Sequence, residues 1–309
     1  MLRYIGNRLL VTIPVVLGVS AIVFLMLHLI PGDPVMVMLG DTPVSQEQME
    51  SLREELGLND PVIVQYGRFM WNAVHGDLGR SIRTNRPVVE EIGERLPSTV
   101  QLAIAAVLLA VLIGVSMGVT AALFRNTWID TLCTALALTG VSLPVFWLGL
   151  MLIFLFALRL GWFPATGQGG LKRLVLPAVT LGWMSAGVIS RLTRSSMLEV
   201  IRAEYIVSAR AKGLVERVVL LRHALPNAMI PVMTVVGLQF GNLLAGTVIT
   251  ETVFARQGIG RLIVEGILQK DFPVVQGAVL CTAMMYALAN LLVDVSYAVV
   301  DPRVREQMR

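Results

Sequence analysis

Long apolar runs separated by shorter polar segments are the dominant pattern of the chain. An apolar run of about 20 residues is long enough to cross a hydrocarbon layer of about 30 Å as an α-helix. Such runs occupy residues 9–30, 99–123, 129–158, 176–195, 228–249 and 274–300. We therefore predict an all-α fold, a transmembrane helical bundle of about six spans. The long third and sixth runs are expected to tilt or to extend past the membrane, and Pro144 to kink the third.

The polar stretch after the first run is expected to be a helical loop outside the cytoplasm. Residues 45–56 fit a short helix that starts at Ser45 and stops at Gly57. Residues 61–76 carry aromatic side chains and are expected to lie on the membrane surface or to pack under the first helix. Amphipathic residues 87–96 lead back to the membrane. The predicted parts are an N-terminal cytoplasmic end with the first span (1–30), an extracytoplasmic loop (31–98) and a five-span core (99–309).

Composition and charge placement support a membrane protein and indicate its orientation. Only 15% of the 309 residues are charged, whereas soluble domains carry about 25%. Arg and Lys gather between the fourth and fifth runs and in the C-terminal tail. The positive-inside rule places these segments, and with them both termini, in the cytoplasm. The net charge of +4 does not indicate a nucleic-acid partner, so membrane lipid is the expected surrounding. The basic residues are Arg191, Arg194, Arg202, Arg210, Lys212, Arg217, Arg222, Arg303, Arg305 and Arg309.

The sequence offers little catalytic or metal-binding chemistry. It contains no Gly-Lys pair, so a phosphate-binding loop for ATP hydrolysis is absent. Its three histidines are far apart and fit no metal-ligand spacing. Cys133 and Cys281 lie inside apolar runs and are expected to be small buried hydrophobic residues. We therefore expect no enzyme activity, no metal site and no cofactor bound by this chain.

One catalytic motif has a competing structural interpretation. Residues 114–118 match the Gly-x-Ser-x-Gly pattern of hydrolase nucleophiles, which needs a strand–turn–helix context. Here the motif lies within a continuous apolar run, where Gly114 and Gly118 favour close helix packing. An intramembrane hydrolase built on Ser116 remains the weaker alternative. A secondary transporter is the other alternative, but it would need inverted repeats that the sequence does not display.

A few polar residues within the later spans are candidates for a solute pathway, because polar groups at membrane depth are costly and usually functional. For Asp294, a structural hydrogen bond and a role in transport both stay open, and Glu251 is expected near the outer interface. The candidate pathway residues are Gln239, Asn242, Glu251 and Asp294.

The segment 196–228, between the fourth and fifth spans, predicts a helix–turn–helix on the cytoplasmic side. Residues 197–211 have helical spacing, and Gly213 supplies a sharp turn. A second helix is expected over 214–224, and Leu225-Pro226 is expected to start a new direction. Small residues (Ala209, Ala211 and Gly213) are expected beside charged ones at the surface. Such a face suits docking into another protein, but a solvated basic loop fits the residues equally well.

The segment 196–228 also resembles the cytoplasmic signature loop of ABC-importer permeases, which contacts an ATPase. The matching residues are Ala209, Gly213, Leu225 and Pro226, with the glycine-to-Leu-Pro spacing of that loop. Val207 and Ser208 stand where the general form has Glu-Ala. The dipeptide/oligopeptide/nickel branch is the more specific match, in its first, B-type permease with a long outer loop after span one. Further stretches that resemble this branch are 28–34, 57–61, 75–79, 194–197, 258–261, 271–276 and 301–305.

The resemblance implies a multi-pass permease of the bacterial cytoplasmic (inner) membrane that forms half of a translocation pathway. Its implied partners are a homologous second permease, two ATPase subunits that bind the ATP, and an external solute-binding protein. Dipeptides or oligopeptides are the implied substrates, and glutathione, nickel chelates and sugars are alternatives that this branch also handles. We call 196–228 the coupling segment. The residues that the resemblance assigns to ATPase coupling are Glu204, Tyr205, Ala209, Arg210, Ala211, Lys212, Gly213, Leu225 and Pro226.

Overall fold

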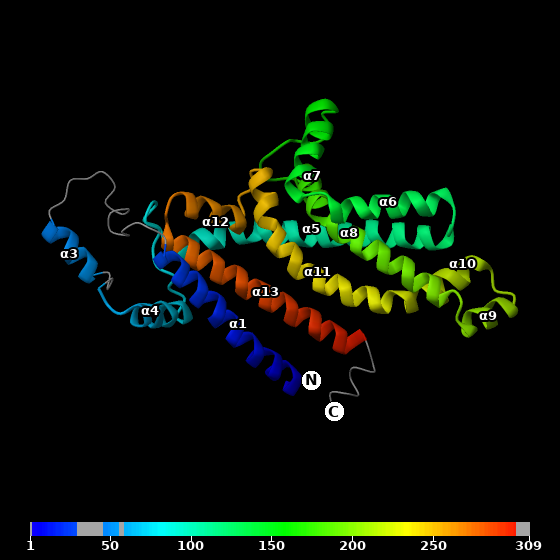
Figure 1. Ribbon diagram of the computed structural model, residues 1–309, viewed down its shortest axis with the longest axis horizontal. Helices are drawn as coiled ribbons and strands as arrows, with labels where there is room; N and C mark the ends of the chain where they lie inside the picture. Colours follow the sequence, from blue (N-terminus) through cyan, green and yellow to red (C-terminus); the bar gives the residue numbers. More distant parts are fainter. Residues whose placement is uncertain (1, 30–45, 56–58, 301–309) are drawn as a thin grey trace. The chain divides into compact units, whose positions relative to one another are not determined.

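The computed structural model describes residues 2–29, 46–55 and 59–300 (Figure 1). Within this part the regular secondary structure is helical, apart from an isolated bridge between Arg80 and Pro87. The helices are α1 (Leu2–Leu29), α3 (Gln46–Glu55), α4 (Val62–Val74), α5 (Val88–Leu123), α6 (Trp128–Ser142), α7 (Val145–Leu152), η1 (Ile153–Arg159), α8 (Lys172–Val200), α9 (Glu204–Ala211), α10 (Glu216–Val218), η2 (Val219–Ala224), α11 (Leu225–Val253), α12 (Ile259–Leu268) and α13 (Phe272–Val300).

Most of the predicted spans appear as long apolar helices. Among the described residues, four helices are long and apolar enough to cross a membrane: α5, α8, the continuous helix Glu216–Val253 and the described part of α13. In α1, residues Ile13–Leu25 form a shorter apolar stretch. The prediction of an all-α membrane bundle is confirmed. The amphipathic stretch 87–96 is not a separate element, because α5 runs through Pro97 without a break.

The third predicted span is broken rather than tilted. α6 ends at Ser142, and the helix from Val145 to Arg159 leaves it at an angle of 114°. The cause is Pro144, whose ring disfavours helical geometry in the residue before it. Leu143 accordingly is extended, with ψ of 132°. The prediction of one tilted, kinked helix over 129–158 is therefore wrong.

The chain folds into two compact units that do not follow chain order. Unit 1 contains Thr99–Arg256 and the chain from Ala289, and unit 2 contains Leu2–Ser98 and Gln257–Leu288. The chain from Gln257 to Leu288, with α12 and the first part of α13, thus belongs with the N-terminal part, whereas the sequence-based division placed it in the core.

Unit 2 joins α1 to the polar segment that follows it. Phe24 of α1 is buried and meets the ring of Tyr66 edge-on, at a centroid distance of 5.5 Å. The Tyr66 and Ser20 hydroxyls lie 2.8 Å apart. The predicted packing of residues 61–76 against the first helix is therefore confirmed, and their position on the membrane surface stays a prediction. Elsewhere in unit 2 the buried Asp271 carboxylate accepts a 2.6 Å hydrogen bond from the Ser81 hydroxyl, fixing the loop before α5.

Unit 1 is assembled around α8, which approaches its neighbours very closely. A Cβ added at Gly114 or Gly118 of α5 would lie 2.8 or 2.5 Å from carbonyl oxygens of α8. Only glycine permits such backbone contact, so the prediction that this pair serves helix packing is confirmed. Ser116 lies between them in an uninterrupted helix, without the strand–turn–helix context of a nucleophile.

Candidate functional site

The coupling segment begins with a break that the sequence pattern does not reveal. α8 ends at Val200, and a tight turn follows in which the Ala203 N–H donates to the Val200 carbonyl at 3.0 Å. Ala203 is extended and α9 starts at Glu204. The prediction of one helix over 197–211 is therefore wrong. The break folds α9 back so that it buries its apolar face against its own unit.

The inner face of α9 packs into a cluster at the end of α8. Ile206 is fully buried and Ala209 is 8% exposed, one helical turn apart on the same face. They join Met197 of α8 and Val219 of η2 in this cluster. The prediction that Ala209 belongs to an exposed small-residue face is wrong, whereas Ala211 and Gly213 are exposed. Whether these residues act in coupling stays a prediction.

Gly213 makes the turn that ends α9. Its φ is +78°, and its N–H donates to the Arg210 carbonyl at 2.9 Å. A Cβ at this position would meet no atom within 4 Å, so the backbone conformation, not space, favours glycine here. The turn predicted at Gly213 is confirmed.

An ion pair closes the loop between α9 and α10. The Arg210 Nε and Nη2 groups donate to the two carboxylate oxygens of Glu216 at 3.0 and 2.6 Å. These hydrogen bonds raise the pKa of the Arg210 guanidinium above its ordinary value. Because its guanidinium is already held, Arg210 shapes the loop rather than projecting as an unbound cation. Lys212 is exposed and makes no ion pair among the described residues.

After the loop, the coupling segment continues into the next span as one uninterrupted helix and does not change direction. α10, η2 and α11 follow one another without a gap from Glu216 to Val253. In η2 the hydrogen bonding widens, and the Leu225 N–H donates to the Leu220 carbonyl. The next residue, Pro226, has no N–H to donate, so a wider turn just before it relieves the clash of its ring with the preceding turn. The predicted change of direction at Leu225-Pro226 is wrong.

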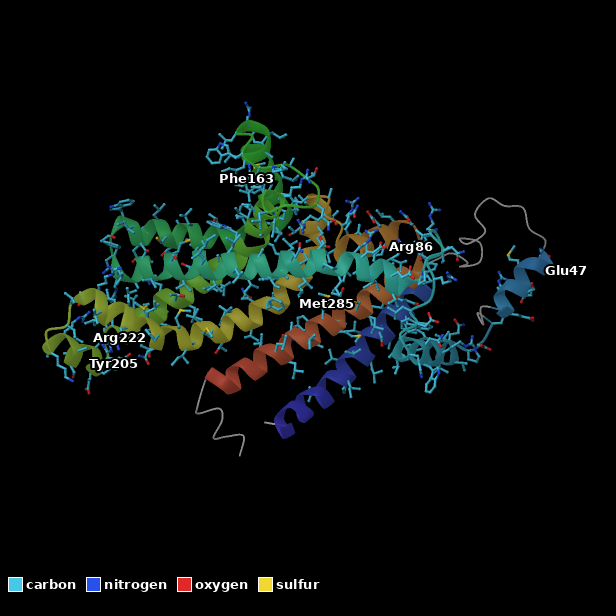
Figure 2. All side chains as sticks on the ribbon, turned by 180° about the vertical axis from the view of Figure 1, so that it is seen from behind. Glu47, Arg86, Phe163, Tyr205, Arg222 and Met285 are labelled. Atoms are coloured by element: carbon cyan, nitrogen blue, oxygen red, sulfur yellow. The ribbon has the colours of Figure 1, made fainter. Side chains whose placement is uncertain are left out.

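The outer face of the coupling segment is unusually apolar for a loop. Tyr205, Val207 and Val215 are 46%, 57% and 71% exposed. Charged Lys212 and Arg217 are exposed beside them. Tyr205 and Arg222 lie at the same end of unit 1 in Figure 2. Exposed aromatic and aliphatic side chains beside basic ones fit a contact surface, and docking to a partner stays a prediction.

The candidate pathway residues fall into different environments. Gln239 is 9% exposed and accepts a 2.8 Å hydrogen bond from the exposed Asn242 amide on α11. Glu251 is fully buried and accepts a 2.7 Å hydrogen bond from the Thr99 hydroxyl. Asp294 lies in α13, where its side chain is outside the described part. The structure thus brings together Gln239 and Asn242, and the roles of all four residues in transport stay predictions.

Sequence reasoning missed an ion pair between two helices of unit 1. Asp130, in the first turn of α6, binds both Arg194 nitrogens that face it, at 2.7 Å each. Arg194 was noted only as a basic residue and as part of a family-like stretch. The available signal was Asp130 itself, a carboxylate at the very start of an apolar run.

Comparison with known proteins assigns the family. Residues 110–306 match the model of the "Binding-protein-dependent transport system inner membrane component", and residues 1–103 match that of its N-terminal region. The dipeptide transport system permease protein DppB of Alkalihalophilus pseudofirmus is 44% identical, over 99% of this chain and all of the relative. DppB of Escherichia coli is 41% identical, with the same coverage of both chains.

A solved structure agrees on the fold. The MetNI methionine ABC transporter, in an inward-facing form, matches with a TM-score of 0.59 at 18% identity over 68% of this chain and 96% of that one. The chain belongs to the family of inner membrane components of binding-protein-dependent transport systems. It is a multi-pass permease of an ATP-driven importer, a transport component and not an enzyme.

Proposed function

We propose that this chain forms half of a translocation pathway for dipeptides and oligopeptides, beside a homologous second permease. An external solute-binding protein delivers the substrate, and two ATPase subunits supply the energy. Both termini and the coupling segment lie in the cytoplasm. The substrate class is supported by the names of relatives that are 41–45% identical over nearly the whole chain.

The observation that carries the coupling role is the two-sided character of α9. Its inner face, with Ile206 and Ala209, is buried in a cluster shared with α8, η2 and α11. Its outer face leaves Tyr205 and Val207 exposed. A helix anchored on one side and apolar on the other can be pushed by a partner and can move the helices behind it. ATPase closure would act on unit 1 through this contact.

The test is Gly213→Asp in the assembled transporter. Aspartate tolerates positive φ better than most residues, and the space around position 213 is open within this chain, so folding and insertion should survive. The new carboxylate would project at the proposed ATPase contact. We expect a normal amount of permease in the membrane, with dipeptide uptake and substrate-stimulated ATP hydrolysis no longer coupled.

Gly170→Asp is the matched control, because Gly170 also has positive φ, +74°, and no atom within 4 Å of an added Cβ. It lies in the loop before α8, away from the coupling segment in sequence, and its variant should transport normally. Normal uptake by the Gly213→Asp variant would remove the segment from the mechanism. Competition of labelled dialanine uptake by glutathione, a nickel chelate or a sugar would test the alternative substrates.

A further inference from the structure

α8 is locked to α6 as well as to α5. A Cβ added at Gly187 of α8 would lie 2.3 Å from the Ala137 carbonyl oxygen of α6, and one at Gly140 of α6 would lie 2.6 Å from the Trp183 carbonyl oxygen. The Trp183 indole N–H also donates to the Thr139 hydroxyl at 3.1 Å. These contacts hold the middle of α8 to the C-terminal part of α6, away from the end at which α8 leads to α9.

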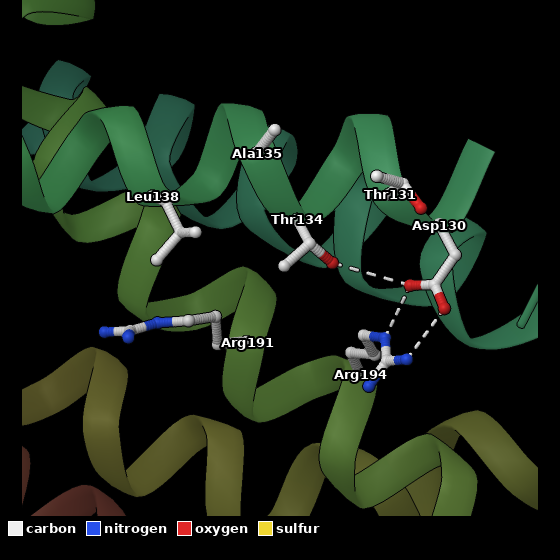
Figure 3. Close-up of a pocket in the computed structure, with 7 residues that line it drawn as sticks. All are labelled: Asp130, Thr131, Thr134, Ala135, Leu138, Arg191 and Arg194. Atoms are coloured by element: carbon white, nitrogen blue, oxygen red, sulfur yellow. Dashed lines mark hydrogen bonds and ion pairs between the residues drawn. The ribbon is translucent and has the colours of Figure 1, made fainter. Parts of the chain in front are cut away.

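The Asp130–Arg194 ion pair joins the same two helices nearer that end. Asp130 is 6% exposed, and its carboxylate accepts hydrogen bonds from Arg194 Nε and Nη2 at 2.7 Å each. It also accepts the Asn126 N–H at 3.0 Å and the Thr134 hydroxyl at 3.4 Å. Figure 3 shows the carboxylate between Thr134 and Arg194, bonded to both. The pair therefore ties α8 to α6 and to the loop before it.

The location of the pair connects it to the coupling segment. Arg194 lies one turn before Met197, which packs in the same cluster as Ile206 and Ala209 of α9. α8 ends at Val200, so little helix separates the ion pair from the turn into α9. A displacement of α9 therefore reaches Arg194 before it reaches the glycine contacts between α8 and α6, at Trp183 and Gly187.

We propose that Asp130 and Arg194 are positioning residues that pass the movement of the coupling segment from α8 to α6. This inference rests on the proposed function. A bidentate guanidinium–carboxylate pair fixes both distance and orientation, whereas apolar contacts allow sliding. Without the pair, the end of α8 can move with α9 while α6 stays behind, and part of the displacement is lost before it reaches the broken span that begins with α6.

The alternative is that the pair only stabilises the fold, and the two roles make different predictions. Asp130 is buried, whereas the Arg194 side chain is 31% exposed. Removing Arg194 leaves a buried carboxylate without its cation and is destabilising, whereas removing Asp130 leaves a guanidinium that still reaches water. Replacing both partners by neutral groups of similar shape is often neutral for stability. A double neutral variant therefore separates stability from positioning.

The experiment uses the full transporter with its partner subunits in proteoliposomes, carrying Asp130→Asn, Arg194→Gln or both substitutions. Three quantities are measured: the thermal midpoint, ATP hydrolysis stimulated by the loaded binding protein, and uptake of radiolabelled dialanine. We expect Arg194→Gln to lower the thermal midpoint more than Asp130→Asn does, and the double variant to recover most of that loss. Uptake per ATP hydrolysed should fall about tenfold in all three, within the usual range of coupling between sites.

Arg191→Gln is the matched control. Arg191 lies one turn before Arg194 on α8 and lines the same groove as Asp130 (Figure 3), but it makes no ion pair among the described residues. It should couple like the wild type. A double variant that regains wild-type uptake per ATP would overturn the inference, as would an equal loss in Arg191→Gln. A wild-type complex without substrate-stimulated ATP hydrolysis would instead overturn the proposed function itself.

Discussion

Ile206 is the residue that anchors α9 to the rest of unit 1. Its side chain is fully buried in the cluster with Met197 and Val219, whereas the adjacent Val207 is 57% exposed. Two neighbouring apolar residues of similar size thus differ in role, because one packs inside the unit and the other lies at its surface. Burial of the Ile206 side chain stabilises the folded protein by roughly 1.5–3 kcal/mol. The exposed Val207 side chain is instead available to a partner.

Shortening Ile206 should therefore loosen α9 locally. Ile206→Ala removes buried methyl groups and leaves a cavity, at a cost of about 2–5 kcal/mol when the site does not collapse. We expect trypsin to cleave the purified permease after Arg202 or Lys212 at least about thirtyfold faster, because α9 opens more often. The measurement is the cleavage rate in detergent, with Val207→Ala as the control. Equal rates for the two variants would show that α9 is not held by Ile206.

At the scale of the element, glycine decides how closely α5 and α8 pack. The added-Cβ distance of 2.5 Å at Gly118 is to a backbone oxygen of Ser190, which has no flexible end that could move aside. Gly93, near the start of the same helix, is exposed and has no atom within 4 Å of an added Cβ. A substitution at Gly118 therefore tests helix packing, whereas the same substitution at Gly93 tests helix propensity alone.

Alanine at these positions should have opposite effects on stability. Gly118→Ala forces α5 and α8 apart and should lower the thermal midpoint of the purified permease, at a cost of about 1–3 kcal/mol. Gly93→Ala should raise or preserve it, because alanine favours a helix by about 1 kcal/mol over glycine. Thermal unfolding of the two variants beside the wild type measures both. A Gly118→Ala variant as stable as the wild type would contradict the close packing.

Sequence predicted the helices well and their interruptions poorly. The apolar runs located α5, α8, α11 and α13 because lipid requires a continuous apolar surface of fixed length. The turn at 201–203 was missed because residues 197–211 keep helical spacing, and only the burial of Ile206 and Ala209 demands a break. Pro144 predicted a kink in the third span, but a proline within an apolar run does not distinguish a kinked helix from a broken one.

The candidate site was predictable only in part, for the same reason. Gly213 was found because a positive φ has a residue preference of its own. The Arg210–Glu216 and Asp130–Arg194 pairs depend on which charged residues the fold brings together, and several cations were available for each carboxylate. A single sequence does not indicate which of these cations pairs with each carboxylate.

At the scale of the whole molecule, the broken span determines on which side of the membrane each loop lies. α5 separates Arg83 from Arg125, and the helix pair from α6 to η1 separates Arg125 from Thr166. If the bent pair crosses the membrane, Thr166 lies on the same side as Arg83. If it is a re-entrant loop, Thr166 returns to the side of Arg125.

Single cysteines distinguish these arrangements. In a background with Cys133 and Cys281 replaced by alanine, cysteine is introduced at Arg83, Arg125, Thr166 or Leu214, all of them exposed. The positive-inside rule puts the basic coupling segment, and Leu214 with it, in the cytoplasm. We expect a membrane-impermeant maleimide to label positions 83 and 166 in intact spheroplasts, and positions 125 and 214 only after permeabilisation. Labelling of position 166 together with 125 would make the bent pair re-entrant. It would also move Leu214 to the outer side, since α8 alone would then lie between them, and a coupling segment there could not meet an ATPase.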